Sequence, residues 1–270
     1  MSAPTQPEPL LHLGLPRPVR GCLFDLDGTL YQGDQPVPGA TRALDSLRRA
    51  GLPLRFVTNT TRFPRAALAD RLAQMGFEAR PEEILTGPSA AADLLRERGL
   101  RRIQLLVAPA TFADFEGFEP VAEDPEAVVV GDLGEGWTFP ILNQAFRNVL
   151  AGAELIALQR NRYWRTEGGL ALDGGPFVVA LEFATGKAAT LAGKPSRSFY
   201  EAALRSLGVP AEEVAMFGDD LEGDVLGAKA LGMMGVAVKT GKYRPEDEER
   251  LQRAADAVID SVAELARPIP

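Results

Sequence analysis

The sequence has very little cysteine and histidine, which excludes several kinds of site. One cysteine and one histidine occur in 270 residues. A single cysteine excludes an internal disulfide, and Cys22 lies in a short apolar run that is expected to join the core. His12 lies in a proline-rich leader, so a Ser-His-Asp triad or a metal site with several histidines is excluded or nearly so. Acid–base chemistry therefore falls to carboxylates or lysine.

Long apolar runs and an excess of basic residues are also missing. No apolar stretch approaches the length of a membrane span, and the N-terminus lacks the basic start and apolar segment of a signal peptide. Lysine and arginine number 29 against 37 aspartate and glutamate, a formal net charge of −8. This balance argues against nucleic acid or an anionic membrane as a partner. We expect a soluble, cytoplasmic protein.

Two aspartates follow the first strand-like segment. The apolar run 22–24 leads into Asp25, Asp27 and Gly28, and such a run predicts a buried strand of a parallel sheet. Side chains alternate along a strand, so both carboxylates would leave its carboxyl end on one side, where open α/β sheets bind ligands. The two repel each other unless a cation lies between them. The alternative, an acidic cap on the following turn, would need only one of them.

Along the rest of the chain, predicted strands alternate with predicted helices. Residues 1–18 carry five prolines and predict an extended leader. The predicted strands cover 22–24, 54–57, 103–107, 127–130, 155–158, 214–217, 235–238 and 257–259. The predicted helices cover 38–50, 64–75, 88–98, a short stretch near Thr111, 140–150, 176–185, 198–207 and 246–253.

The heptapeptide F-D-L-D-G-T-L, residues 24–30, resembles the first signature of the haloacid dehalogenase superfamily phosphatases. In that family the first aspartate is a nucleophile that becomes an aspartyl phosphate, and the second is the general acid and base. Mg²⁺ is bound beside them, in part through the backbone carbonyl of the second aspartate. The resemblance therefore implies catalytic roles and metal contacts for Asp25 and Asp27.

Two further stretches resemble the family's second and third motifs. V-T-N-T-T follows the second strand, so the resemblance implies that Thr58 binds the phosphoryl group, with Asn59 and Thr60 beside it. The alternative is that Thr58 and Asn59 merely cap the next helix. G-K-P matches the third motif and makes Lys194 the lysine that bridges nucleophile and phosphate. Lys187 lies at a predicted helix end, where a solvated lysine is ordinary.

G-D-D-L-E-G-D, residues 218–224, resembles the fourth motif. The resemblance implies that Asp219 is a metal ligand and that Asp224 supports the ligands. It allows Asp220 to reach the metal through water. The alternative, an acidic loop that caps the helix at Val225, explains one of the three aspartates but not all of them.

The order of the four motifs implies a fold. The resemblance predicts a Rossmann-like α/β fold, with a parallel-sheet core over 19–81 and 188–270 and an inserted α/β cap of the C2 type over 82–187. An insertion between the second and third motifs is typical of NagD-like phosphatases. The stretch 142–177 is similar to the branch of phospholysine, phosphohistidine and inorganic pyrophosphate phosphatases. Asp132 and Trp137 are expected on the cap's substrate-facing loop.

The resemblance implies a Mg²⁺-dependent phosphatase that hydrolyses a small phosphorylated metabolite, either a phosphomonoester or a pyrophosphate or phosphoramidate. Caps of this type often dimerise, which suggests a homodimer. A metal-independent haloacid dehalogenase is one alternative, but Asp27 and Asp219 argue against it. A phosphoacceptor module without turnover is another, but such a module needs neither a cap nor the paired aspartates.

Overall fold

The computed structural model describes residues 13–166 and 168–266, and this part of the chain divides into two compact units. Within the described residues, the first unit consists of 13–58, 69–85 and 200–266, and the second of 59–68 and 86–199 without residue 167. Residues 1–12 of the predicted leader, with His12, lie outside the described part. Within the described ranges, no helix has the length and apolar character needed to cross a membrane.

The unit borders do not coincide with the predicted domain borders. The units change at 85/86 and 199/200, whereas the predicted core and cap change at 81/82 and 187/188. The assignment of a catalytic core and a cap to these ranges therefore remains a prediction.

A six-stranded sheet forms the centre of the first unit, in the order β15-β14-β13-β1-β4-β5. The strands are β1 (Gly21–Asp25), β4 (Leu54–Thr58), β5 (Ile84–Thr86), β13 (Val214–Gly218), β14 (Met234–Val238) and β15 (Ala257–Ile259). The pairs from β15 to β4 are all parallel. A short hairpin, β2 (Tyr31–Gln32) and β3 (Gln35–Pro36), follows β1.

The central strands are apolar throughout because both faces of the sheet are covered. Every residue of β1, β13 and β14 is buried, as expected for parallel strands between helical layers. Phe24 and Phe217 are partners in register on β1 and β13, and their rings stack with centroids 4.9 Å apart. The stacked rings fix the two strands one residue before Asp25 and Gly218, so the strand ends reach the sheet edge together.

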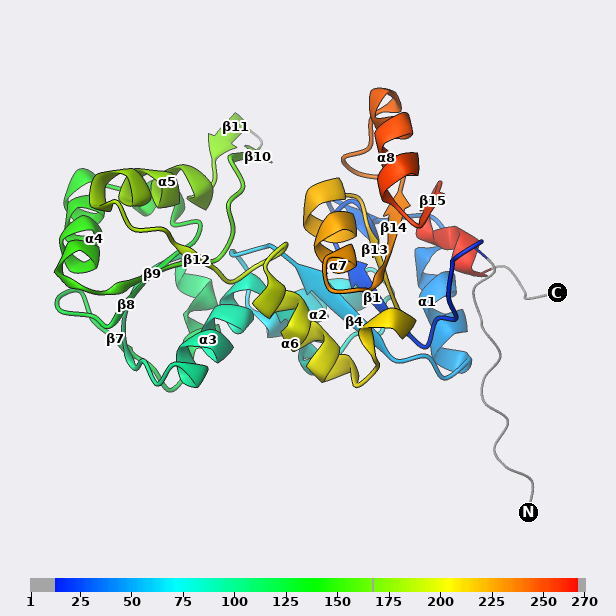
Figure 1. Ribbon diagram of the computed structural model, residues 1–270, viewed down its shortest axis with the longest axis horizontal. Helices are drawn as coiled ribbons and strands as arrows, with labels where there is room; N and C mark the ends of the chain where they lie inside the picture. The colour runs from blue at the N-terminus through cyan, green and yellow to red at the C-terminus, as the bar shows by residue number, and fades with distance from the viewer. Residues whose placement is uncertain (1–12, 167, 267–270) are drawn as a thin grey trace, which may run out of the picture. The chain divides into compact units, whose positions relative to one another are not determined.

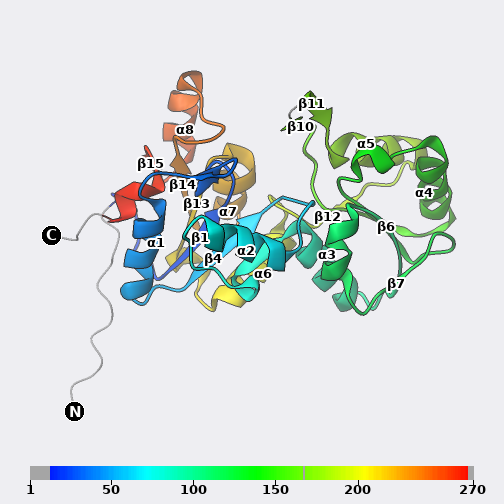
Figure 2. The ribbon, with the colours of Figure 1, turned by 180° about the vertical axis from the view of Figure 1, so that it is seen from behind.

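Helices flank this sheet: α1 (Ala40–Arg49), α2 (Arg65–Gln74), α6 (Arg197–Leu207), α7 (Gly227–Lys229) and α8 (Glu248–Ala254). Figures 1 and 2 show α1 and α7 on opposite sides of β1, β13 and β14. The predicted apolar face of α1 is confirmed, because Ala43, Leu44 and Leu47 are buried. This helix packs against the short helical segment Val262–Ala266, which closes the described chain.

The second unit holds a parallel sheet of five strands in the order β12-β9-β8-β6-β7. They are β6 (Arg102–Leu106), β7 (Glu119–Pro120), β8 (Ala127–Val130), β9 (Glu154–Ala157) and β12 (Thr190–Leu191). The helices are α3 (Gly87–Glu97), α4 (Phe139–Ala151) and α5 (Gly174–Thr185), and a hairpin consists of β10 (Tyr163–Thr166) and β11 (Gly169–Leu172).

Alternation along β8 builds two cores, one on each face of this sheet. Ala127 and Val129 pack with the buried face of α3, whereas Val128 and Val130 pack with α4 and α5. This is the two-residue periodicity of a strand covered on both sides. The second unit is therefore a three-layer α/β structure, with α3 against one face of the sheet and α4 and α5 against the other (Figure 1).

The structure adds the short strands β2, β3, β5, β7 and β12 to the predicted ones, and three further parts of the chain differ in kind from the prediction. The helix expected near Thr111 is a 3₁₀ segment, Pro109–Phe115, opened by a proline. The segment that begins at Tyr163 forms the hairpin β10–β11, and Gly169, the first residue of β11, has φ +117°, a conformation that favours glycine. Residues Leu221–Leu226 form a π-helical turn before α7, which no periodicity in six residues could reveal.

Candidate active site

The candidate site lies where the order of the first sheet reverses. Strand β1 pairs with β4 on one side and with β13 on the other, so the chain leaves β1 in one direction and returns to it from the other. Ligands of open α/β sheets bind beyond the carboxyl ends of the strands at such a point. Asp25 is the last residue of β1, Thr58 the last residue of β4, and Asp219 follows β13 directly.

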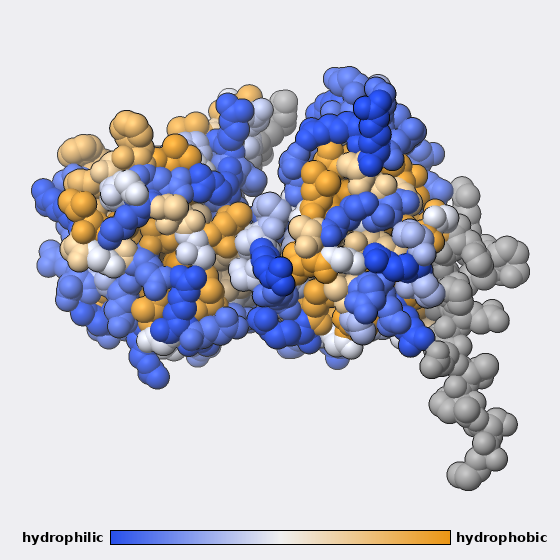
Figure 3. Space-filling view, viewed as in Figure 1, coloured by the Kyte–Doolittle hydropathy of each residue, from blue (hydrophilic) through white to orange (hydrophobic). Residues whose placement is uncertain are grey.

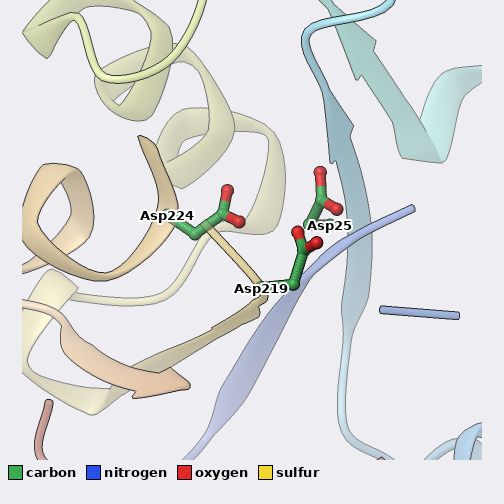
Figure 4. A group of neighbouring side chains, drawn as sticks. All are labelled: Asp25, Asp219 and Asp224. Carbon is green, nitrogen blue, oxygen red and sulfur yellow. The ribbon is translucent and has the colours of Figure 1, made fainter. Parts of the chain in front are cut away.

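Three buried carboxylates converge at this edge. One carboxylate oxygen from each of Asp25, Asp219 and Asp224 lies within 4.8 Å of the others. Figure 4 shows Asp25 and Asp219 beside each other at the ends of β1 and β13, with Asp224 approaching from the turn after β13. Asp27 is exposed, and its side chain is not a member of this group. The predicted metal contact of Asp27 through its backbone carbonyl therefore stays a prediction.

Two glycines leave the space that the Asp219 carboxylate occupies. Gly28 has φ +92° and Gly241 has φ +63°, in the left-handed region that favours glycine. A Cβ atom at either position would overlap Asp219 Oδ2. The same oxygen accepts a hydrogen bond from the backbone N–H of Lys242 at 2.8 Å. The orientation of Asp219 is therefore set by backbone close to both β1 and β14.

The π-helical turn holds Asp224 in place. Asp224 is fully buried, and its Oδ2 accepts a hydrogen bond from the backbone N–H of Asp220 at 3.0 Å. The hydroxyl of the buried Tyr200 donates to the Gly223 carbonyl oxygen at 2.7 Å, which anchors the turn to α6. Asp220 itself caps the turn, because its Oδ1 accepts from the Gly223 N–H at 2.8 Å.

The crowding of carboxylates changes their acidity. Burial, together with repulsion by the Asp25 and Asp224 carboxylates, raises the pKa of Asp219 to about 8. Asp27 lies at an exposed position, yet its pKa is also raised, because neighbouring protein displaces water around the carboxyl group and Asp25 repels its charge. A raised pKa favours the protonated form of a carboxyl group, which is the form that can donate a proton.

The chemistry of this group fits a divalent cation. Buried carboxylates this close together repel one another, and a hard cation would offset that repulsion. Mg²⁺ takes oxygen ligands and is commonly held by one or two carboxylates with water and a substrate phosphate. Asp25 supplies such an oxygen from the end of β1, and Asp219 and Asp224 supply two more from the end of β13 and the turn that follows it.

The hydroxyls near the strand ends are buried. Thr29 donates to Asp25 Oδ2 at 3.4 Å, a long and weak hydrogen bond, and is itself fully buried. Thr58 is 5 % exposed and ends β4, next to the strand that carries Asp25. A role for Thr58 in binding a phosphoryl group remains a prediction, as does that of Thr60.

Lys194 and Asn59 are paired within the second unit. The Asn59 side chain accepts from the Lys194 backbone N–H at 2.8 Å and donates to the Lys194 carbonyl oxygen at 2.9 Å. Lys194 is buried. These bonds join the Asn59 side chain to Lys194, and they are not the helix cap considered as the alternative for Asn59. The other candidate lysine, Lys187, is exposed and donates to the Val149 carbonyl oxygen.

Asp132 and Trp137, expected on a substrate-facing loop, have partners within the second unit. Asp132 is buried, its Oδ1 accepts from the Gly134 N–H at 2.8 Å, and its Oδ2 lies 3.6 Å from Arg62. The Trp137 ring stacks on Phe177 with centroids 4.0 Å apart. Contact of either residue with a substrate remains a prediction.

Comparison with known proteins agrees with the arrangement in the first unit. A family model described as haloacid dehalogenase-like hydrolase matches residues 22–117, and a related model, HAD-hydrolase-like, matches 191–265. The human haloacid dehalogenase-like hydrolase domain-containing protein 2 is 47 % identical over 235 residues, which cover 87 % of this chain and 90 % of that protein. The chain belongs to the haloacid dehalogenase-like hydrolases.

Other relatives place the chain among the phosphatases of this hydrolase family. The human phospholysine phosphohistidine inorganic pyrophosphate phosphatase is 39 % identical, with 91 % of this chain and 92 % of that protein covered. The crystal structure of 4-nitrophenylphosphatase from Thermotoga maritima superimposes with a TM-score of 0.86 at 30 % identity, covering 93 % of this chain and 98 % of that one. The prediction of a hydrolase of the phosphatase class is confirmed.

Two further structures of the family bear on the fold and on the metal. NagD from Escherichia coli K-12 superimposes with a TM-score of 0.84 at 26 % identity, covering 91 % of this chain and 98 % of that one. The predicted NagD-like α/β fold is thus confirmed. A glycerol phosphate phosphatase from Mycobacterium tuberculosis, in complex with magnesium, superimposes with a TM-score of 0.82 at 29 % identity, covering 92 % and 76 % of the two chains.

One part of this haloacid dehalogenase-like site was not found from the sequence. The segment after β14 packs on the acidic group through Gly241 and Lys242, and the Thr240 hydroxyl donates to the Gly28 carbonyl oxygen. The Lys242 ammonium pairs with the Asp220 carboxylate. The glycine that closely follows β14, the neighbour of β13, indicates that this segment can approach the acidic group, but not which of its residues contacts Asp219.

Proposed function

We propose that this chain is a Mg²⁺-dependent phosphatase that uses Asp25 as its nucleophile and acts on a small phosphorylated metabolite. The observation that carries the proposal is the convergence of Asp25, Asp219 and Asp224 at the switch point of the sheet. A cation there, when bound, would supply positive charge for the phosphate oxygens and offset the three carboxylates.

In the proposed reaction Asp25 is the nucleophile and Asp27 is the general acid and base. An Asp25 oxygen attacks phosphorus, the bond from phosphorus to the leaving oxygen breaks, and Asp27 donates its proton to that oxygen. A water molecule then attacks the aspartyl phosphate, Asp27 accepts a proton from it, and phosphate is released with Asp25 restored. The raised pKa of Asp27 supports the first role, since a protonated carboxyl is needed at the start.

Thr58 and Lys194 complete the proposal as phosphate-binding groups. Thr58 is the last residue of β4, the strand next to β1, and from this position its hydroxyl would donate to a phosphoryl oxygen. The Lys194 ammonium would balance the charge of the phosphate, and Asn59 would fix the backbone of that lysine. Thr60 would add a third polar group beside them.

The substrate class is drawn from the relatives. A phosphomonoester is proposed because the structural neighbours include enzymes named for nitrophenyl phosphate and glycerol phosphate. Pyrophosphate and phosphoramidate bonds are second candidates, because one relative is named for phospholysine, phosphohistidine and inorganic pyrophosphate. Phosphate release from a panel of all three bond types, with Mg²⁺ and with EDTA, would separate them. Phosphate release undiminished in EDTA would contradict the metal requirement, and release of halide from a haloacid without release of phosphate would favour the dehalogenase alternative.

The nucleophile is tested by substitution. Asp25→Asn keeps the shape of the side chain but removes the attacking oxygen, so turnover of p-nitrophenyl phosphate should fall below detection while the circular dichroism spectrum is unchanged. Asp93→Asn is the matched control, because Asp93 is exposed and pairs with Arg96 on α3. Turnover by Asp25→Asn within about tenfold of wild type, roughly 1.4 kcal/mol in the barrier, would overturn the assignment.

A homodimer through the second unit is also proposed. Large apolar side chains are exposed on α4 and α5, among them Phe139 at 78 % and Phe183 at 91 % exposure, and Figure 3 shows apolar residues on the surface of this unit. Burial of such side chains would stabilise an interface. Light scattering after gel filtration tests the proposal: wild type should run as a dimer and Phe183→Asp as a monomer. A monomeric wild type at micromolar concentration would contradict it.

A further inference from the structure

One ion pair beside the acidic group has no part in the proposed reaction. Asp220 follows Asp219 in the chain, yet its carboxylate is not among the three that converge. Its Oδ2 pairs with the Lys242 ammonium, and its Oδ1 accepts from the Gly223 N–H at 2.8 Å. Both oxygens of Asp220 are thus engaged, while its backbone N–H donates to Asp224.

Lys242 contacts both Asp219 and Asp220. Its backbone N–H donates to Asp219 Oδ2 at 2.8 Å, and its side chain holds Asp220. The Lys242 side chain is 63 % exposed and that of Asp220 is 34 % exposed, so the ion pair contributes little to the stability of the fold. An exposed pair that neighbours a group of three carboxylates is better explained by its effect on that group.

We propose that Lys242 is a positioning residue for cation selectivity: its ammonium keeps the Asp220 carboxylate out of the ligand set and thereby favours Mg²⁺ over Ca²⁺. The inference rests on the proposed metal site. Mg²⁺ requires near-ideal octahedral geometry and retains several waters, whereas Ca²⁺ accepts six to eight oxygens in flexible arrangements. A fourth carboxylate would therefore strengthen Ca²⁺ binding more than Mg²⁺ binding.

The test is titration calorimetry of Mg²⁺ and Ca²⁺ into the full chain without substrate. Lys242→Met retains the backbone N–H but removes the ammonium, so the ratio of Ca²⁺ to Mg²⁺ affinity should rise at least fivefold. Lys242→Arg retains the charge and should keep the wild-type ratio. Asp220→Asn combined with Lys242→Met removes the extra carboxylate as well, so the ratio should return to within twofold of wild type.

A matched control is available on the same segment. Lys239 lies three residues earlier and pairs with Glu248 at 2.9 Å, away from the three carboxylates, so Lys239→Met should leave the ratio unchanged. An unchanged ratio in Lys242→Met, with the variant folded, would overturn the inference. Failure of the metal site itself would be distinct, because wild type would then bind neither cation, or Asp219→Asn would bind both as wild type does.

Discussion

The side-chain amide of Asn59 brackets the backbone of Lys194, accepting from its N–H at 2.8 Å and donating to its carbonyl oxygen at 2.9 Å. One side chain thus satisfies both backbone groups of a buried lysine, although the two residues are 135 positions apart. The segment that carries Lys194 is therefore held by Asn59, a residue distant in the sequence but in the same unit.

This pairing predicts that Asn59 and Lys194 act together. Lys194→Ala should lower kcat/KM for p-nitrophenyl phosphate at least 100-fold, about 2.7 kcal/mol, because the phosphate loses its ammonium partner. Asn59→Leu removes both hydrogen bonds and should lower it at least tenfold while Lys194 is present. Lys187→Ala is the control, since Lys187 is exposed and bonds a helix-end carbonyl. Equal losses in Lys187→Ala and Lys194→Ala would refute the assignment.

The packing of Gly241 predicts an effect on metal affinity. A methyl group on Gly241 would overlap Asp219 Oδ2, so Gly241→Ala should weaken Mg²⁺ binding at least tenfold, measured by calorimetry without substrate. Gly33→Ala is the matched control, because Gly33 has φ +57° and no atom would lie within 4 Å of its Cβ. Both variants carry the same backbone strain, about 1 kcal/mol, but only one displaces the carboxylate. Similar losses in both would assign the effect to strain alone.

The proposed acid role of Asp27 predicts a dependence on the leaving group. An alkoxide needs a proton as it departs, whereas p-nitrophenolate leaves without one. Asp27→Asn should therefore lower kcat/KM for an alkyl phosphate at least tenfold more than for p-nitrophenyl phosphate. Any disturbance of the metal should affect both substrates alike. A ratio near one at saturating Mg²⁺ would leave Asp27 without an acid role.

The raised pKa of Asp219 predicts how stability depends on pH. Without metal, the folded protein holds a proton on this carboxyl between pH 4 and 8 that the unfolded chain has released. This group therefore contributes stability at low pH, and its contribution to the free energy of unfolding is lost as the pH rises toward 8. Thermal unfolding in EDTA should show this loss, while saturating Mg²⁺ and Asp219→Asn should each reduce it. A flat profile in EDTA would mean that the carboxylates do not interact as described.

The gathering of the acidic residues could be predicted from the sequence because parallel strands share a carboxyl edge. Asp25 and Asp219 each follow a short apolar run, so adjacent strands bring them together, as the structure does. The contact of Lys242 with Asp219 could not be predicted, since it depends on the bend of the segment after β14. The bonds of Asn59 were missed for a related reason: they join residues that no local pattern connects.

The pairing of β1 with β13 has a consequence for the order of events on the ribosome. Gly21 pairs with Val214, so β1 emerges about 190 residues before its neighbour, a delay of roughly 10 to 40 s at ordinary rates of translation. The stretch 86–199 is complete before then and contains its own sheet. Asp25 is therefore synthesised long before Asp219 and Asp224. A truncated product that stops before residue 214 would lack the three-carboxylate group altogether.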